Sequence, residues 1–254
     1  MNSKNITFNG ALNEKLSAKL DMPEDGSPKA CALFAHCFTC SKNLHAVRNI
    51  SKALNNKNIA VFRFDFTGLG QSGGDFSKTN FSSNIEDLVA AANYMKENMQ
   101  APEILIGHSM GGPAVIRAAH DIDSAKVVST VGATCDPEHV THHFGSYNDV
   151  ILKEGEAVVE IAGRPFKIRK QFLEDLKKTN MKGYIENLKR PLLLFHSPTD
   201  NTVSISNATD IFMAAKHPKS FISLDNADHL LSNERDSRFV GSMLGTWVDR
   251  YLDV

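Results

Sequence analysis

The sequence is poor in cysteine and tryptophan and has no long apolar run. Its 254 residues include four cysteines and one tryptophan. No apolar stretch approaches the ~18 residues that a membrane-spanning helix needs. The opening residues Met1 to Asn5 are not followed by the apolar segment of a secretory signal. We therefore expect a cytoplasmic protein that does not associate with membranes.

The sequence also lacks an excess of charge of either sign. Lys and Arg number 28, Asp and Glu number 29, and the formal net charge is -1. Proteins that bind nucleic acid or anionic membranes carry basic patches, so neither partner is expected. A chain of this length buries roughly 70% of its unfolded surface. It therefore needs neither disulfides nor a metal ion to stabilise its core.

The cysteines are spaced unevenly, since three of them are Cys31, Cys37 and Cys40 and the fourth is Cys135. This spacing is not typical of a disulfide framework, and reduced thiols are expected in the cytoplasm. Zinc sites usually combine two Cys/His clusters, and His36 with its neighbouring cysteines has no second cluster to join. We expect no metal and no cofactor. Cys37 and Cys40 are interpreted as small buried side chains, with a redox-sensitive thiol as the alternative.

Short apolar runs alternate with segments of helical spacing along most of the chain. Apolar residues recur on one helical face within residues 44–54, 85–95 and 236–252. Continuous apolar strands between helices are typical of a mostly parallel sheet covered on both faces. Asn5–Phe8 and Lys15–Asp21 are expected to add an antiparallel edge. The other predicted strands are Ala30–Ala35, Ile59–Phe64, Glu103–Ile106, Lys126–Val131, Pro191–Phe195 and Ser220–Leu224.

Residues 135–188 interrupt this alternation and are too many for a simple loop. Within them, Glu156–Ile168 is predicted to form a hairpin, and Gln171–Lys178 and Met181–Leu188 to form short helices. We interpret the chain, residues 1–254, as one domain in which residues 135–188 are a small lid. The alternative is an ordinary crossover that has no role in catalysis.

The motif Gly107-His108-Ser109-Met110-Gly111 follows one of the predicted strands and precedes a helix-like segment with small residues at its start. In this G-x-S-x-G context the serine lies on a sharp strand-to-helix turn, and the glycines permit close approach of neighbouring backbone. The helix N-terminus favours negative charge beside the serine. A serine that only caps the helix would not need flanking glycines, so Ser109 is the predicted nucleophile.

A nucleophilic serine needs a histidine base, which is in turn oriented by a carboxylate. Asp200 and His229 follow the last two predicted strands, in the chain order serine, acid, histidine. We assign Asp200 as the orienting acid and His229 as the base. Asp225 and Asp228 are too near His229 in sequence to reach its ring and are expected to stabilise that loop. His108 and His196 are expected to pack beside the site.

The tetrahedral intermediate of acyl transfer needs two N–H donors for its oxyanion. One donor is expected to be the backbone N–H of Met110, directly after the nucleophile. The other comes from the loop after an earlier strand, which here begins at His36. We predict that the backbone N–H of Phe38 is this second donor.

These motifs, together with Asp65-Phe66-Thr67-Gly68-Leu69-Gly70-Gln71-Ser72, resemble the α/β-hydrolase superfamily over nearly the whole chain. The resemblance implies the α/β-hydrolase fold, here with a mostly parallel eight-stranded sheet, helices on both faces and a small lid. Many members have His-Gly-x where this chain has His36-Cys37-Phe38, and a Cβ restricts that turn. The chain also resembles bacterial hydrolase domains that are often fused to an OsmC-like domain, although no such domain is expected after Val254.

The favoured hypothesis is a serine esterase that cleaves a small-molecule carboxylic ester through an acyl-enzyme. The shortness of residues 135–188 favours small or short-chain acyl groups. Thioester hydrolysis, amide cleavage and acyl transfer use the same intermediate and remain alternatives. A hydrolase-fold protein that binds a ligand without catalysis is an alternative of another class.

Overall fold

The computed structural model describes residues 2–252, and its main feature is an eight-stranded sheet in the order β1-β2-β4-β3-β5-β6-β9-β10. β1 pairs antiparallel with β2, and β2 with β4, whereas the remaining pairs are parallel. The predicted mostly parallel sheet with an antiparallel edge is therefore confirmed. The strands are β1 (Asn2–Asn9), β2 (Lys15–Met22), β3 (Ala30–Ala35), β4 (Ile59–Phe64), β5 (Ile104–His108), β6 (Val127–Val131), β9 (Leu192–His196) and β10 (Lys219–Ser223).

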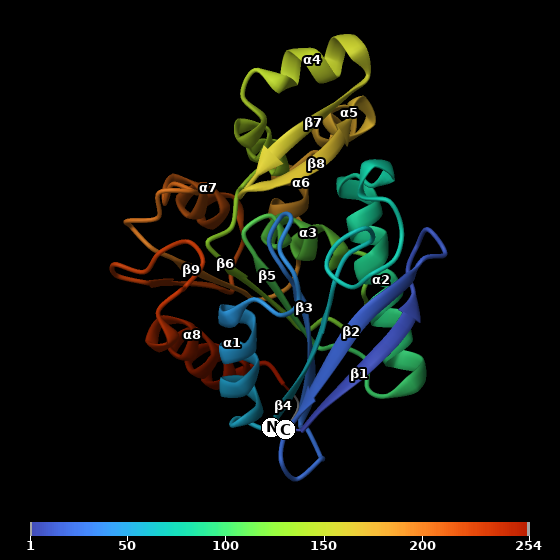
Figure 1. The fold of residues 1–254 in the computed structure, drawn as a ribbon. Helices are drawn as coiled ribbons and strands as arrows, with labels where there is room; N and C mark the ends of the chain where they lie inside the picture. Colours follow the sequence, from blue (N-terminus) through green and yellow to red (C-terminus); the bar gives the residue numbers. More distant parts are fainter. Residues whose placement is uncertain (1, 253–254) are drawn as a thin grey trace.

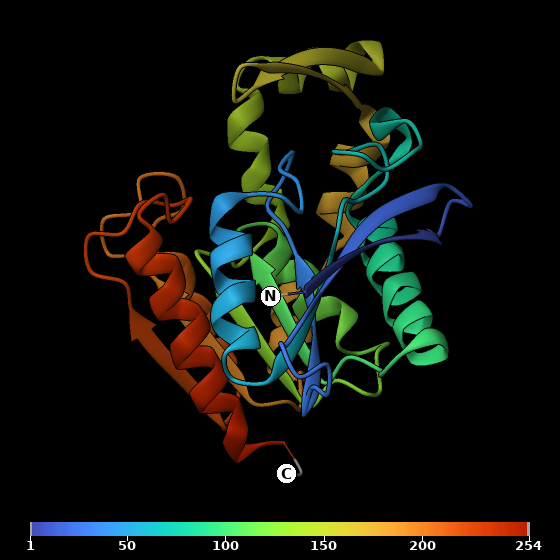
Figure 2. The same ribbon diagram turned by 60° about the horizontal axis from the view of Figure 1, so that its bottom comes forward.

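Helices cover both faces of this sheet (Figures 1 and 2). α1 and α8 lie side by side on one face, where their apolar residues form one buried cluster with the sheet. α2, α3 and α7 contribute to the cluster on the other face. The helices are α1 (His45–Asn55), α2 (Phe81–Asn98), α3 (Gly111–Ala118), α7 (Ser206–Ala214) and α8 (Glu234–Trp247), with short 3-10 turns η1 (Phe76–Lys78) and η3 (Val248–Arg250).

The central strand β3 shows why the strands are apolar throughout. All six of its residues are buried. Ala32 and Phe34 belong to the cluster under α1 and α8, whereas Leu33 and Ala35 belong to the cluster on the opposite face. Because successive side chains of a strand point to opposite faces, a strand covered on both sides must be apolar at every position.

Residues between β6 and β9 extend beyond the edge of the sheet where β3, β5 and β6 end (Figure 1), and their buried apolar side chains join the cluster on the α2 and α3 face. The predicted hairpin is present as β7 (Glu156–Ile161) and β8 (Arg164–Arg169), which pair antiparallel. The predicted helices are α5 (Lys170–Lys178) and α6 (Met181–Glu186). The sequence patterns did not indicate the 3-10 helix η2 (Pro137–Phe144) or α4 (Tyr147–Glu154).

The parallel strands bring the predicted site residues to one edge of the sheet. The carboxyl ends of parallel strands meet there, and ligands of open α/β sheets bind beside them. His36 follows β3, Ser109 follows β5, Asp200 follows β9 and His229 follows β10. Within residues 2–252, no helix is both long enough and apolar enough to cross a membrane.

Candidate active site

Ser109 lies in the tight turn between β5 and α3. Its φ angle is 55°, in the left-handed region that non-glycine residues seldom occupy. Two hydrogen bonds hold this turn, since the Ser109 N–H donates to the Val131 carbonyl and its own carbonyl accepts from the Gly112 N–H, both at 2.9 Å. The surrounding backbone therefore maintains a conformation that presents the serine side chain at the end of β5.

The glycines on either side of Ser109 allow α3 to begin directly against the sheet. A Cβ atom at Gly107 would lie 2.2 Å from the Gly111 carbonyl oxygen, and one at Gly111 would lie 2.4 Å from the Ala35 carbonyl oxygen. Real Cβ atoms do not approach backbone oxygens so closely. The short distance at Gly111 also shows that the start of α3 lies against the end of β3, next to the loop that carries Phe38.

The side chains of Ser109, His229 and Asp200 form a continuous hydrogen-bonded row. His229 Nε2 lies 3.0 Å from Ser109 Oγ, and His229 Nδ1 lies 2.8 Å from Asp200 Oδ2. Ser109 and Asp200 are each 9% exposed. The structure therefore brings together the three residues that the chain order predicted, in the geometry that base-assisted attack by a serine requires.

Asp200 is held as a carboxylate. Burial alone would raise its pKa, but the His229 ring and the backbone N–H groups of Val203 and Thr202 outweigh burial and lower the pKa below the usual value. Both N–H groups donate to Oδ1 at 2.8 Å, which leaves Oδ2 for His229. Asp200 can therefore accept a hydrogen bond from His229 Nδ1 and stabilise a positive charge on that ring.

The neighbouring histidines have other partners. His108 Nε2 donates to the His229 carbonyl at 2.8 Å, and His196 Nε2 donates to the Val203 carbonyl at 2.8 Å. Burial lowers the pKa of both rings, that of His108 to about 3, so both are neutral. These hydrogen bonds support the loops that carry His229 and Asp200.

The two acidic residues near His229 bond within their own loop. Asp225 accepts from the Ser223 hydroxyl at 2.7 Å, and Asp228 accepts from the Ser232 N–H at 2.8 Å. Asp200 is the carboxylate that contacts His229 Nδ1.

The backbone N–H groups of Phe38 and Met110 are available to a ligand. Within residues 2–252, neither N–H donates a hydrogen bond to another protein group. Both residues line the same pocket beside the turn that carries Ser109. Two free donors beside a serine nucleophile are what an oxyanion site requires.

The carbonyl of Cys37 belongs to the same peptide unit as the Phe38 N–H. It accepts hydrogen bonds from His36 Nδ1 at 2.8 Å and from the Cys40 N–H at 3.1 Å. In a trans peptide the C=O and N–H bonds point in opposite directions. Fixing this carbonyl therefore fixes the direction in which the Phe38 N–H points.

Cys37 and Cys40 form a disulfide, with their Cα atoms 5.3 Å apart. The expectation that these thiols are reduced is wrong for this pair. That expectation came from the predicted compartment, whereas the tight turn after β3 brings the two side chains together. The remaining cysteines, Cys31 and Cys135, are free thiols. Residues 2–252 contain no group of three or more His, Cys, Asp or Glu side chains arranged to hold a metal ion.

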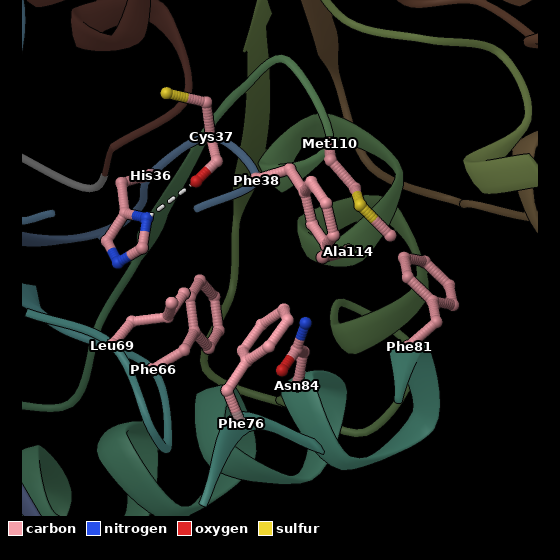
Figure 3. A pocket seen from close by; sticks show the side chains of 11 residues that line it. His36, Cys37, Phe38, Phe66, Leu69, Phe76, Phe81, Asn84, Met110 and Ala114 are labelled. Atoms are coloured by element: carbon pink, nitrogen blue, oxygen red, sulfur yellow. Dashed lines mark hydrogen bonds between the residues drawn. The ribbon is translucent and has the colours of Figure 1, made fainter. Parts of the chain in front are cut away.

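Aromatic side chains form much of the wall of the pocket beside the turn that carries Ser109 (Figure 3). The free space between them is about that of one water molecule. The Asn84 amide lies at the pocket wall beside Phe76, and Cys37 Sγ points away from the pocket. The lining residues are His36, Cys37, Phe38, Phe66, Leu69, Phe76, Phe81, Asn84, Met110, Gly111 and Ala114.

A buried ion pair that the sequence patterns did not reveal anchors the far end of the loop after β3. Lys42 Nζ lies 2.5 Å from Asp65 Oδ2, and the Lys42 N–H donates to Asp65 Oδ1 at 2.6 Å. Arg63 Nη1 donates to the Lys42 carbonyl at 2.5 Å. Side chains that pair across 23 residues are visible only once β3 and β4 lie next to each other.

Comparison with known proteins places the chain among hydrolases. A family model described as serine aminopeptidase S33 matches residues 26–153. The esterase domain of a Rhodothermus marinus protein is 52% identical, has a TM-score of 0.82, and the match covers 99% of this chain and 100% of that one.

More distant proteins are also similar to this chain. Est1E from Butyrivibrio proteoclasticus, solved with ferulic acid, is 18% identical with a TM-score of 0.81, over 98% of this chain and 100% of that chain. The uncharacterized protein YfhR of Salmonella typhi is 23% identical over 233 residues, which are 90% of this chain and 75% of that protein.

Proposed function

This chain belongs to the serine aminopeptidase S33 family of α/β-hydrolases, and we propose that it hydrolyses carboxylic esters with Ser109 as the nucleophile. The observation that carries the proposal is the row of hydrogen bonds from Ser109 through His229 to Asp200. The similarity to the Rhodothermus marinus esterase domain supports ester bonds as the substrate class.

In the proposed reaction, His229 Nε2 takes the proton of Ser109 as Oγ attacks the ester carbonyl. Asp200 stabilises the imidazolium that results. The negative charge that develops on the carbonyl oxygen is stabilised by the N–H groups of Phe38 and Met110. His229 then protonates the leaving alcohol, and water attacks the acyl-enzyme with His229 again as the base. No step requires a cofactor.

The pocket between Phe38, Phe76, Phe81 and Met110 is proposed to take the acyl group, because it lies beside both oxyanion donors. Its apolar wall suits a hydrocarbon, and its narrow free space supports a short acyl group such as acetyl, which enters only if the surrounding side chains move slightly apart. A longer chain would have to displace aromatic side chains that already contact one another.

We propose that residues 135–188 act as a small lid within one domain formed by residues 1–254. Phe38 supports this role, because its ring lies 6.2 Å from that of Phe144 and 5.6 Å from that of Phe172. The Phe76 ring likewise lies 5.2 Å from that of Phe166. Aromatic side chains from this segment thus pack directly against the pocket wall.

The test is a series of p-nitrophenyl esters from acetate to dodecanoate, with kcat/KM measured for each. We expect turnover that is highest for acetate or butyrate and falls with longer chains. A preference for long chains would overturn the acyl-pocket proposal while leaving the esterase proposal intact.

Aminoacyl p-nitroanilides and acyl thioesters, measured in parallel, test the alternative reactions of the same acyl-enzyme. Turnover of one of these without turnover of any ester would replace the esterase proposal. Ligand binding without any turnover would favour a non-catalytic role.

A further inference from the structure

The disulfide between Cys37 and Cys40 encloses a proposed oxyanion donor. Only Phe38 and Thr39 lie between the two cysteines, and Phe38 supplies the N–H. The Cys40 N–H donates to the Cys37 carbonyl, which is the other end of the same peptide unit. A bond that holds Cys40 against Cys37 therefore also maintains the orientation of the Phe38 N–H.

The enclosed turn is strained at Thr39, although hydrogen bonds to the Cys37 carbonyl and the aromatic packing of Phe38 also hold it. Thr39 has a φ angle of 59°, which is unfavourable for a β-branched residue. The Thr39 carbonyl accepts a hydrogen bond from Arg164 Nη2 of β8. Without the disulfide, Thr39 can relax toward an ordinary backbone conformation, and Cys40 moves with it.

The chain on both sides of this turn is fixed independently of the disulfide. Ala35 ends the central strand β3, where it pairs with β5. Lys42 is held by Asp65 and Arg63, and the Lys42 and Asp65 side chains are at most 1% exposed. Opening the disulfide should therefore change the short segment 37–41 and leave the rest of the fold in place.

The two cysteines of the disulfide differ in exposure. Cys40 is partly exposed, whereas Cys37 is only 4% exposed. The other two cysteines are poor competitors for thiol exchange. Burial raises the pKa of Cys31 to about 12 and that of Cys135 to about 11, so both remain protonated and unreactive near neutral pH.

We propose that the Cys37–Cys40 disulfide is a reversible redox modification site for a dithiol reductant, and that its reduction lowers the rate of ester turnover at Ser109. This inference rests on the proposed esterase function. It adds that the oxyanion site is assembled in the disulfide form and loosened in the dithiol form.

In the proposed exchange, one thiolate of the dithiol attacks Cys40 Sγ, because Cys40 is the partly exposed residue of the pair. The Cys37–Cys40 bond breaks, Cys37 leaves as a thiolate and takes up a proton. The second thiolate of the reductant then attacks the reductant's own sulfur in the mixed disulfide and releases Cys40 as a thiolate, which is protonated. Two electrons pass to the protein, and the reductant becomes a disulfide.

Reduction should lower kcat and leave KM nearly unchanged. An oxyanion donor acts mainly on the transition state, so losing its alignment does not weaken substrate binding in proportion. Complete removal of such a donor costs roughly 10²- to 10³-fold in kcat. Because the reduced loop still samples the aligned conformation, we expect a loss of roughly ten- to a hundred-fold.

The experiment measures kcat and KM for p-nitrophenyl acetate after incubation with dithiothreitol or with oxidised glutathione. Mass spectrometry of alkylated peptides verifies the state of Cys37 and Cys40, and circular dichroism checks that the fold is retained. The expected result is a lower kcat after reduction that is restored by reoxidation. The double variant Cys37→Ser/Cys40→Ser should match the reduced protein and not respond to reductant.

Cys135→Ser is the matched control and should respond to reductant as the unaltered protein does. Equal kcat in both verified states overturns the redox inference and leaves the proposed esterase function standing. A rise in KM after reduction without a fall in kcat also overturns the redox inference. Absence of ester turnover in both states overturns the proposed function and the inference together.

Discussion

Ser109 and His229 are 120 residues apart in the sequence, yet Ser109 Oγ lies 3.0 Å from His229 Nε2. The parallel sheet creates this contact, because β5 and β10 both end at the edge where the two residues follow them. The loop after β9 adds Asp200 to the same edge. The proposed chemistry is thus a consequence of strand order rather than of sequence proximity.

Asp200→Asn should lower kcat for p-nitrophenyl acetate by roughly 10⁴-fold, because an amide neither fixes the His229 tautomer nor stabilises its positive charge. His229→Ala should lower kcat at least as much, since it removes the base. Steady-state kinetics with active-site titration measures both effects.

Asp228→Asn is the control for the Asp200 variant. Asp228 is adjacent to His229 in sequence but accepts a hydrogen bond from the Ser232 N–H, which an amide oxygen can also accept. Its kcat should stay within about two-fold of that of the unaltered protein, since the side chain bonds within its own loop. A loss as large as that of Asp200→Asn would contradict the assignment of the acid.

Gly111→Ala should impair turnover by about ten-fold or more while the protein still folds. The added Cβ would lie 2.4 Å from the Ala35 carbonyl oxygen, and backbone can yield only by moving β3 away from α3. That movement shifts the Phe38 and Met110 N–H groups relative to each other, and overpacking of this kind costs about 1–3 kcal/mol in stability.

Gly73→Ala serves as the comparison, because its added Cβ would meet no atom closer than 3.4 Å. Normal kcat in both glycine variants would mean that the close approach at Gly111 does not support the oxyanion site. Thermal unfolding of both proteins separates loss of fold from loss of alignment.

The sequence predicted those features that depend on local patterns of residues. Apolar runs predicted the strands, and the positions of Asp200 and His229 after successive strands predicted their meeting with Ser109. The η2 and α4 segments were missed although Val140, Phe144 and Ile151 recur at a helical spacing, because each segment has only eight residues and Gly145 interrupts the pattern between them.

Features that depend on contacts between distant segments could not be predicted. The Lys42–Asp65 pair requires β3 beside β4, and the packing of Phe38 on Phe172 requires the segment between β6 and β9 to fold over the loop. The Cys37–Cys40 disulfide depends on the turn geometry, which residue spacing alone does not specify.

Asp65→Asn should destabilise the protein by about 3–5 kcal/mol, because it leaves the buried Lys42 ammonium without its counter-charge. The Lys42 side chain is 1% exposed and the Asp65 side chain is fully buried. Urea unfolding monitored by circular dichroism measures the free energy of unfolding.

Asp121→Asn breaks a surface pair for comparison. Asp121 and Arg117 pair at 2.6 Å, but their side chains are 45% and 24% exposed. Such pairs contribute about 0.5 kcal/mol or less. A similar decrease in the free energy of unfolding in the two variants would show that the buried Lys42–Asp65 pair stabilises the fold no more than a surface pair does.

The stability of the protein should fall as the pH drops from 8 to 5, and His108 should account for a large part of this fall. Burial lowers the pKa of His108 from 6.5 to about 3. Below pH 6.5 the unfolded chain therefore binds a proton that the folded chain excludes. The resulting loss of stability is about 2 kcal/mol at pH 5 relative to pH 8.

His108→Gln removes this titration and retains a donor that can reach the His229 carbonyl. The free energy of unfolding, measured in urea at pH 8 and pH 5, should therefore decline less in the variant than in the unaltered protein. Parallel declines in the two proteins would show that His108 does not remain neutral inside the folded chain.

Covalent labelling with a fluorophosphonate probe, followed by mass spectrometry of the digested protein, tests whether Ser109 is the nucleophile. We expect one labelled residue, Ser109, and no labelling of Ser109→Ala or of protein unfolded before the probe is added. Labelling of Ser109→Ala at the same rate and extent as the unaltered protein would contradict this assignment.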